Sequence, residues 1–282
     1  MTLPPLVEPI AALSDQERAR TARHAALIGI GPVGQRRLAA ARVGVIGAGG
    51  LGSSVLLSLA AAGVGELVVI DDDTVDVSNL HRQIIHGMGD VGRPKLESAA
   101  ESVAAVSPET TFTARSVRLD PDNAVELLRG CDVVIDGSDT FATRTAVAAA
   151  CEALGTPLVW GTVQEFHAQI TVFWSAPPDG VEPVVLADLH DPAEVGEPPT
   201  CAMVGVLGAL CIQVGALMAT EAIKLIVGSG ETLLGRVLLV DGLRARQREV
   251  PIRSTRRGPA ATADPARTTT GGPAATTEGE VS

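Results

Sequence analysis

The sequence predicts an α/β fold: a Rossmann-like, mainly parallel sheet with helices on both faces, extended by antiparallel strands in the C-terminal half. Between residues 42 and 160, short apolar runs such as VGVIG, LVVID and DVVID alternate with helical patterns. Continuous apolar runs are typical of parallel strands that are covered on both faces. After residue 160 this alternation ends, and a long strand, a proline-rich loop, a long helix and a hairpin-like pair follow.

The individual elements follow from the same patterns. A capping-box sequence, Ser14-Asp15-Gln16-Glu17, opens a helix that carries Arg20 and Arg23. The predicted strands of the parallel part are 43–47, 67–71, 132–136 and 157–160, and its predicted helices are 50–62, 94–106, 122–129 and 139–154. The C-terminal half is predicted to contain a strand at 164–174, a loop at 175–200, a helix at 203–227 and strands at 236–241 and 245–252.

Composition limits the class of protein. Hydrophobic residues make up 46% of the 282 residues, enough for a substantial core, and the net charge of −11 has the wrong sign for a general nucleic-acid binder. We expect a flexible N-terminus at 1–13, one domain at 14–252 and a disordered tail at 253–282, which is poor in apolar bulk. The first residues lack the pattern of a signal peptide, so we expect a cytoplasmic protein.

One apolar segment raises the question of a membrane span. Residues Cys201 to Thr220 carry no charge over 20 residues, which is long enough to cross a bilayer. Gln213 interrupts the segment, and Glu221 and Lys224 continue its helical pattern. A buried core helix is therefore favoured over a membrane span, and no membrane is expected as a partner. No cysteine pair has C-x-x-C spacing, so neither a zinc site nor a disulfide framework is expected. Three cysteines are predicted to be inert core residues: Cys131, Cys151 and Cys211.

A glycine-rich loop points to a nucleotide. In RVGVIGAGGLGSSVLLSLAAAGV, residues 42–64, Gly47, Gly49 and Gly52 fit G-x-G-x-x-G between a strand and a helix. These glycines permit a tight turn, a close approach to phosphate and close helix–strand packing, and the helix N-terminus offers free N–H groups. Asp71, at the end of the next strand, is placed to accept hydrogen bonds from ribose. Because this glycine pattern most often binds a dinucleotide, the pattern by itself favours a dinucleotide as the ligand.

The residues after Asp71 favour ATP instead. Arg82 and Lys95 together can neutralise a triphosphate, for which a dinucleotide has less use. In DGSDTFATR, Asp136 and Asp139 follow another strand, and Asp139 is placed to hold magnesium. Most single residues of these types are solvated surface groups. Their expected co-location at one sheet edge makes the dehydrogenase hypothesis improbable.

Several motifs together resemble the MoeB/ThiF/HesA family of adenylating enzymes, which are related to ubiquitin-activating enzymes. They are GAGGLG, the Asp71-x-Asp73 pair, SNLHRQ, DVGRPK and DGSDTFATR, followed by QITVFW, TCAMVGVLG and GETLLGRVLLVDGL. The resemblance covers about residues 14–252 and is strongest to the MoeZ-type module, which lacks the paired zinc cysteines of many relatives. The rhodanese domain that usually follows that module is not part of this sequence.

This resemblance implies ATP- and magnesium-dependent adenylation of the C-terminal glycine of a ubiquitin-like sulfur-carrier protein that ends in Gly-Gly, with release of pyrophosphate. A sulfur donor, such as a separate rhodanese or desulfurase, then forms a thiocarboxylate. The carrier and its pathway (molybdopterin, thiamine, cysteine or a specialised thio-metabolite) stay open. Two alternatives also stay open: a non-catalytic nucleotide- or carrier-binding scaffold, and an ATP-dependent tRNA-modifying dehydratase, against which the acidic charge weighs.

The resemblance also implies roles for single residues. Arg23 would reach the ATP of a partner subunit, which implies a homodimer, and Cys201 would either take part in sulfur chemistry or be structural. The remaining roles are the phosphate loop (Gly47, Gly49, Gly50, Gly52), the ribose (Asp71), nucleotide binding in general (Asp73), the phosphates (Asn79, Arg82, Gln83, Lys95), the magnesium ion (Asp139) and catalysis (Arg82, Lys95, Asp139 and Cys201).

The chain departs from the family pattern at four places. The aromatic residue expected between Arg20 and Arg23 is missing, and Thr140 replaces the asparagine that usually follows Asp139. Glu165–Ala168 and Met203–Val204 also differ, and these positions face the carrier and the sulfur chemistry in the family. Adenylation is therefore a firmer expectation than sulfur transfer.

Overall fold

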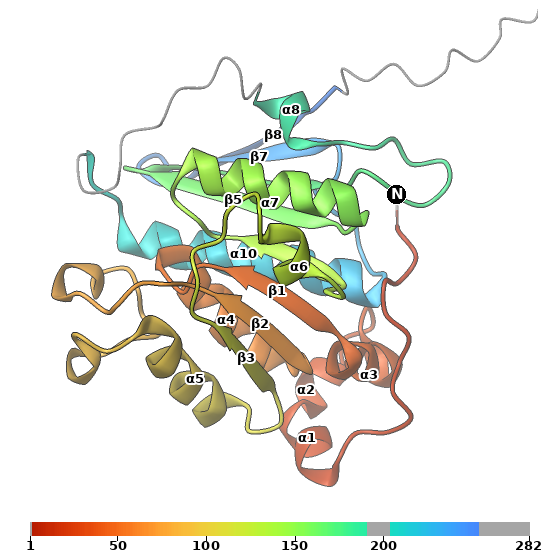
Figure 1. Cartoon of the computed structure of the whole chain (residues 1–282). Coiled ribbons are helices and arrows are strands. Elements are labelled where there is room, and N and C mark those ends of the chain that lie inside the picture. The colour runs from red at the N-terminus through yellow and green to blue at the C-terminus, as the bar shows by residue number, and fades with distance from the viewer. Residues whose placement is uncertain (1, 191–203, 254–282) are drawn as a thin grey trace, which may run out of the picture.

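The structure, a computed structural model, describes residues 2–190 and 204–253. Its centre is one eight-stranded sheet with the order β3-β2-β1-β4-β5-β6-β7-β8 (Figure 1). The first five strands in that order are parallel, and the last three continue the sheet antiparallel. The expected fold class is thus confirmed. The strands are β1 (Arg42–Ile46), β2 (Glu66–Ile70), β3 (Thr111–Arg115), β4 (Val133–Asp136), β5 (Leu158–Gln164), β6 (His167–Phe173), β7 (Arg236–Asp241) and β8 (Arg246–Pro251).

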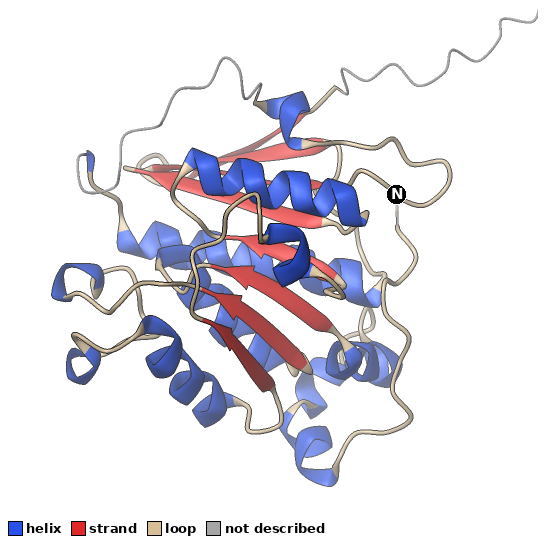
Figure 2. Ribbon diagram, in the orientation of Figure 1, coloured by secondary structure: helices blue, strands red, loops and turns tan. Residues whose placement is uncertain are grey.

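Helices cover both faces of the sheet (Figure 2). One face carries α3 (Gly31–Ala40), α4 (Gly50–Ala62), α5 (Lys95–Val106) and α10 (Gly208–Val227). The opposite face carries α6 (Ala124–Leu128), α7 (Phe141–Leu154) and the short α8 (Leu186–Leu189). Two short helices, α1 (Asp15–Arg20) and α2 (Ala22–Ala25), precede α3, and the turns η1 (Val77–Asn79) and η2 (Met88–Asp90) lie in the excursion between β2 and α5.

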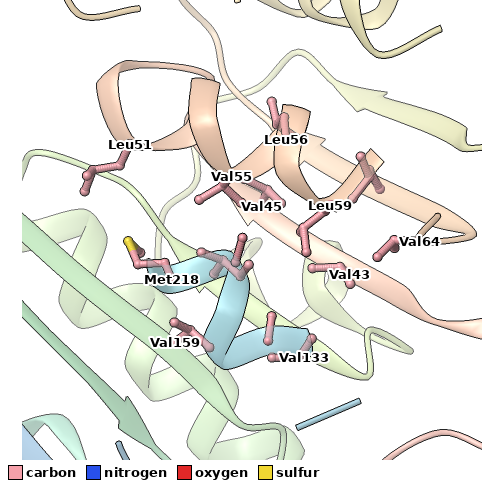
Figure 3. Packing of buried hydrophobic residues seen from close by; sticks show 14 of the residues in the cluster. Val43, Val45, Leu51, Val55, Leu56, Leu59, Val64, Val133, Val159 and Met218 are labelled. Carbon is pink, nitrogen blue, oxygen red and sulfur yellow. The ribbon is translucent and has the colours of Figure 1, made fainter. Parts of the chain in front are cut away.

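The larger core cluster joins α4 and α10 to the sheet. Leu51, Val55 and Leu59 of α4 lie beside Met218 of α10 and the valines of β1, β4 and β5 (Figure 3). Alternate residues of each strand point to the other face, where a second cluster packs under α6 and α7. Because both faces are buried, the parallel strands are apolar throughout, as their sequences predict.

The apolar segment near residue 210 forms α10, which is long and apolar enough to cross a membrane by length and composition. In this fold, however, 61% of its 18-residue window is buried, and it packs on α4, α3, β5 and β6. Its acidic residue, Glu221, is only 5% exposed; it accepts a hydrogen bond from the Leu233 backbone N–H at 2.8 Å and pairs with Lys224. The expectation of a core helix is confirmed.

Some boundaries differ from those predicted. The N-terminal helix is broken at Thr21 into α1 and α2, although Ser14 caps it as expected by accepting a hydrogen bond from the Glu17 N–H at 3.0 Å. The strand predicted at 157–160 continues to Gln164 as β5, and the strand predicted at 164–174 begins only at His167 as β6, because the chain turns at Glu165, whose φ is 52°. Helix α10 begins at Gly208 rather than 203, after Gly205 adopts a φ of +79°.

Three of the strands and α-helices were not predicted: β3, α3 and the short α8, which falls in the predicted loop at 175–200. Strand β3 reads TFTAR and lies at the sheet edge, where three of its five residues are exposed and two are half-buried, so it lacks an apolar run. Helix α3 begins with Gly-Pro-Val-Gly, a sequence typical of loops, although proline is well tolerated in the first turn of a helix.

The N-terminal segment predicted to be loose makes defined contacts from Leu3 onward. Leu3 and Val7 are each 7% exposed and belong to the core cluster. The backbone N–H of Leu6 donates to the Leu225 carbonyl at 3.1 Å, so this segment lies along the C-terminal part of α10. The predicted tail, 253–282, falls outside the described residues except for Arg253.

The crossing of α4 and α10 leads to a stability prediction for Gly215→Ala. A β-carbon at Gly215 would lie 2.0 Å from Ser54 Oγ and 2.5 Å from the Leu51 carbonyl oxygen. We expect the overpacking to lower the free energy of unfolding by about 1–3 kcal/mol, in spite of alanine's higher helix propensity. Urea titration measures this change in the free energy of unfolding, and Thr220→Ala, at an exposed position of the same helix, is the control. A Gly215→Ala protein as stable as the wild type would contradict this packing.

Candidate functional site

The candidate site lies where the strand order reverses. Strands β1 and β4 are neighbours, but their following connections run to opposite faces of the sheet, and ligands of open α/β sheets bind in the crevice at this point. Two adjoining hollows occupy it at the carboxyl ends of the strands. The two hollows share five lining residues: Gly47, Asp71, Asp73, Ser138 and Asp139.

The glycine loop joins β1 to α4 and lines the smaller hollow. Gly47 has a φ of +87°, and a β-carbon at Gly52 would lie 1.8 Å from the Gly47 carbonyl oxygen, so only glycine allows α4 to begin there. Gly49 precedes the first turn of the 13-residue α4, and no side chain caps it. The first N–H groups of the helix are therefore available to an anion, and its dipole favours one.

Asp71 connects the end of β2 to this loop. One carboxylate oxygen accepts the Ala48 N–H at 2.8 Å, and the other accepts the Asp73 N–H at 2.8 Å. Each oxygen keeps a further lone pair, so the carboxylate can still accept hydrogen bonds from ribose hydroxyls. Asp71 also lines the larger hollow, of about 550 Å³, which has the size of a small-molecule site.

Three cations line the smaller hollow: Lys95, Arg82 and Arg144, of which the first two were predicted. The Lys95 side chain is 6% exposed, and its Nζ lies 2.8 Å from Asp73 Oδ2, so this ammonium already has a counter-ion. Arg82 lies against Gly50, and its Nη1 contacts the Ser78 carbonyl oxygen at 3.2 Å and His81 Nε2 at 2.9 Å. Within residues 2–190 and 204–253, Arg82 has no carboxylate partner. Its charge is thus available to a phosphate.

Gln83 and Asn79 form a hydrogen-bonded pair below the glycine loop. Gln83 Nε2 donates to Asn79 Oδ1 at 2.7 Å, and the Gln83 side chain lines the smaller hollow although it is 4% exposed. Its Oε1 atom is buried and has no hydrogen-bond partner in the described part of the chain. Buried polar atoms are normally satisfied, so this one indicates a site that is completed by a ligand.

Asp139 faces both hollows from the turn after β4. It is exposed, and the turn is fixed at Ser138, whose N–H donates to Asp136 Oδ1 at 2.9 Å. Mg²⁺ is usually bound by one or two carboxylates together with substrate phosphates, and Asp139 opposite Asp73 fits that donor set. Thr140, one of the departures, caps α7: its Oγ1 accepts the Thr143 N–H at 3.2 Å. The replacement therefore keeps a good N-cap.

Arg23 does not join the other predicted residues. It is exposed on α2, which lies beside the end of α4 that is remote from the glycine loop, because His24 contacts Gln35 and Gln35 donates to the Ala62 carbonyl. Helix α4 has 13 residues, about 20 Å of length. Arg23 therefore lies far from the nucleotide loop of its own chain.

The sequence of this chain is similar to that of known proteins over most of its length. The model of the ThiF family matches residues 21–259. The chain belongs to the ThiF family. It is 50% identical over 262 residues to the probable adenylyltransferase/sulfurtransferase MoeZ of Mycobacterium tuberculosis, covering 93% of this chain and 67% of MoeZ. It is 43% identical over 251 residues to the sulfur carrier protein adenylyltransferase of Thermus thermophilus, covering 89% and 93% of the two chains.

The fold of this ThiF-family protein is shared with more distant structures. The crystal structure of Escherichia coli MccB superposes with a TM-score of 0.72 at 20% identity, covering 85% of this chain and 71% of that one. The predicted family and fold are confirmed. With the named adenylyltransferases among its relatives, the chain is an adenylyltransferase of the MoeB/ThiF type, and its family is consistent with the use of ATP.

The cysteines of this ThiF-family chain differ in their surroundings. Cys201 lies outside the described residues. Burial raises the pKa of the Cys131 thiol to about 11 and also raises that of Cys151, as expected of inert core residues. Cys211 was expected to be the same, but although it is 3% exposed it also lines the smaller hollow, beside Gly50. Within the described ranges, no group of three or more His, Cys, Asp or Glu side chains has the arrangement of a metal site.

Three parts of the site were missed from the sequence. Residues 117–121 line the larger hollow, but they follow β3, which was not recognised as a strand. Arg144 lines the smaller hollow and belongs to the DGSDTFATR motif, which had been used only for its aspartates. His86 ends SNLHRQIIH; it is 7% exposed and contacts the Ala48 carbonyl oxygen at 3.1 Å and Ser98 Oγ at 2.9 Å. It therefore supports the glycine loop from below.

The environment of His86 predicts a pH dependence of stability. Burial lowers the pKa of this imidazole below 6.5, against a smaller opposite effect of its hydrogen bond to Ala48. Below pH 6.5 the unfolded chain binds the proton first, so the unfolding free energy falls as pH is lowered through 6.5 and levels off below the folded-state pKa. Urea titrations between about pH 7 and pH 5 should show a shallower fall in His86→Gln. Equal slopes in both proteins would contradict it. Burial also lowers the pKa of His190, so part of the pH dependence of the unfolding free energy remains in the wild type and in His86→Gln.

Proposed function

We propose that this protein uses Mg-ATP to adenylate the C-terminal glycine of a small ubiquitin-like sulfur-carrier protein. The products are a carrier acyl-adenylate and pyrophosphate. A separate sulfur donor then converts the adenylate to a thiocarboxylate. The curated relatives named above, together with the SAMP-activating enzyme E1 of Haloferax volcanii, which is 44% identical over 83% of this chain and 85% of its own, support this assignment.

One observation carries the proposal: the groups that ATP needs converge on one hollow. The uncapped N-terminus of α4 and the side chains of Arg82, Lys95 and Asp139 all border it. A helix N-terminus and two cations supply the spread positive charge that a triphosphate requires. The larger hollow beside Asp71, between 117–121 and 138–143, then takes the nucleoside.

The same arrangement suits attack of a carboxylate on the α-phosphate. The carrier carboxylate attacks the phosphorus, the bond to the bridging oxygen breaks, and pyrophosphate leaves. Catalysis of this kind depends on in-line positioning and charge stabilisation more than on a protein nucleophile. Arg82 and Lys95 stabilise the charge on the transferring and leaving phosphates. A magnesium ion held by Asp139 would offset negative charge on the phosphates.

The valines that border the smaller hollow support a Gly-Gly tail as the second substrate. This hollow holds about 120 Å³ and is bordered by Val163, Val206 and the glycine loop. A peptide end without side chains can enter it, whereas a bulky terminal residue would collide with these valines. We therefore expect the carrier tail to enter between the end of β5 and the residues that precede α10.

A homodimer completes the proposal. Arg23 lies far from its own nucleotide loop, so it contributes to a phosphate site only in trans, from a second copy. Next to it, the apolar side chains of Leu27 and Ile28 are 54% and fully exposed, which suits a buried subunit contact. Because a two-fold dimer is the commonest closed assembly, two equivalent sites would result.

ATP–pyrophosphate exchange tests the reaction. We expect exchange that depends on a carrier ending in Gly-Gly, and a fall of at least about a hundredfold in Asp139→Asn because the charge at the developing phosphate centre is lost. Asp179→Asn, an exposed aspartate in a loop away from the hollows, is the matched control. ATP binding without exchange for any Gly-Gly carrier would instead indicate a scaffold. Turnover of a modified tRNA base would indicate the dehydratase.

Mixing two inactive variants tests the action of Arg23 in trans. Arg23→Ala and Asp139→Asn each leave both sites of a homodimer defective. In a mixed dimer, one site carries both defects and the other carries none, so random mixing should restore about one quarter of wild-type exchange. Activity that stays at the level of the separate variants, with mixed dimers demonstrated by two affinity tags, would place Arg23 in its own subunit's site or in neither.

A further inference from the structure

A buried cation, Arg144, lies directly behind the turn that carries Asp139. Arg144 belongs to the first turn of α7 and is 7% exposed. Its Nη2 and Nε atoms both donate to the Ser138 carbonyl oxygen, at 2.8 Å and 3.2 Å. This forked contact holds the residue immediately before Asp139.

The same turn is held from its other side by Asp136. This carboxylate is fully buried at the end of β4, and its Oδ1 accepts the Ser138 N–H at 2.9 Å. Both backbone polar groups of Ser138 are thus bound to charged side chains, one acidic and one basic. Hydrogen bonds to charged groups are stronger than neutral ones, so the path of the chain into Asp139 is closely defined.

Arg144 is in turn fixed by an aromatic platform. Its guanidinium lies 5.3 Å from the ring centre of Trp160, which is 1% exposed, and His190 packs on the same indole at 5.5 Å. Trp160 on β5 pairs in register with Asp136 on β4, so the platform and the counter-charge are neighbours on one face of the sheet. Burial raises the pKa of Asp136, whereas the charge of Arg144 acts to lower it.

Burying these polar groups costs desolvation free energy that packing alone would not require. Asp136 Oδ2 and Trp160 Nε1 are buried and have no hydrogen-bond partner among residues 2–190 and 204–253. Buried charged and polar groups are often replaceable by apolar side chains without loss of stability. Their presence behind one functional turn indicates that the orientation of the turn is what they provide.

We infer that Arg144 is a positioning residue: braced by Asp136 and Trp160, it fixes the Ser138–Asp139 turn so that the Asp139 carboxylate meets the magnesium-bound phosphates of ATP. The inference rests on the proposed function for the reaction, but its direct consequence is a property of nucleotide binding. The Asp71 side of the site does not depend on Arg144. Loss of Arg144 should therefore weaken the effect of magnesium on ATP binding and leave metal-free binding of ATP unchanged.

Calorimetric titration of the full chain with ATP, in EDTA and in magnesium, tests this. For Arg144→Lys and Arg144→Ala we expect metal-free ATP affinity within about twofold of wild type, and magnesium-supported affinity lowered about tenfold. Added guanidinium ion should restore the magnesium effect in Arg144→Ala. The matched control is Arg236→Ala, which removes the same forked contact from a backbone carbonyl, that of Thr232, at a distance from the site.

Each other outcome overturns the inference. An unchanged magnesium effect in Arg144→Lys would show that the turn does not depend on the guanidinium fork. Equal losses with and without magnesium would show that Arg144 binds phosphate directly. A lower melting temperature with both affinities unchanged would show a role in packing only. These titrations need no carrier, so a wild-type protein without carrier-dependent exchange would refute the proposed function and leave this test intact.

Discussion

The contact between Gly52 and Gly47 is the constraint on which the rest of the site depends. A β-carbon at 52 would lie 1.8 Å from the Gly47 carbonyl oxygen, so the first turn of α4 rests on the end of β1 only because both residues are glycine. That approach brings the uncapped N–H groups of α4 to the crevice between β1 and β4. Gly215 serves the same end from the far side, because it lets α10 press on α4 at Ser54. Close packing thus creates the anion site before any charged residue contributes to it.

The charged groups around this site are largely paired before a nucleotide arrives. Lys95 is bound to Asp73, and both oxygens of Asp71 accept backbone N–H groups. A triphosphate therefore competes with Asp73 for the ammonium of Lys95. Arg82 can bind the triphosphate without first losing an ion pair to a carboxylate of the described residues. In a protein with a net charge of −11, this arrangement keeps the positive charge local. The carboxylates that remain exposed, such as Asp139, suit a cation that arrives with the phosphates.

The sequence predicts most of the parallel half of the sheet because each element carries its own local signal. The strands are apolar runs, the helices have regular periodicity, and a glycine loop joins the first strand to its helix. Strand β3 fails the same test because an edge strand such as TFTAR needs no apolar run, and with it the segment 117–121 of the larger hollow is lost. The positioning role that we infer for Arg144 also cannot be predicted from the sequence. A sequence shows that an arginine follows Ser138 by six positions, but not that its guanidinium turns back onto that carbonyl or that Trp160, from the next strand, supports it.

The departures from the family pattern divide along the architecture of the sheet. Thr140 keeps the cap of α7, so the nucleotide half retains its geometry. Glu165 lies in the antiparallel half, at a φ of 52°, and its backbone bonds to Gly205 and Leu207 join the β5–β6 turn to the segment that leads into α10. That segment includes Val206, which borders the narrow hollow where we place the carrier tail. Under the proposed function, we therefore expect substitutions at 165–168 to act on the shape of this entrance, and through it on which carrier is accepted, while the hydrogen bonds that orient Asp71, Lys95 and the Asp139 turn stay independent of them.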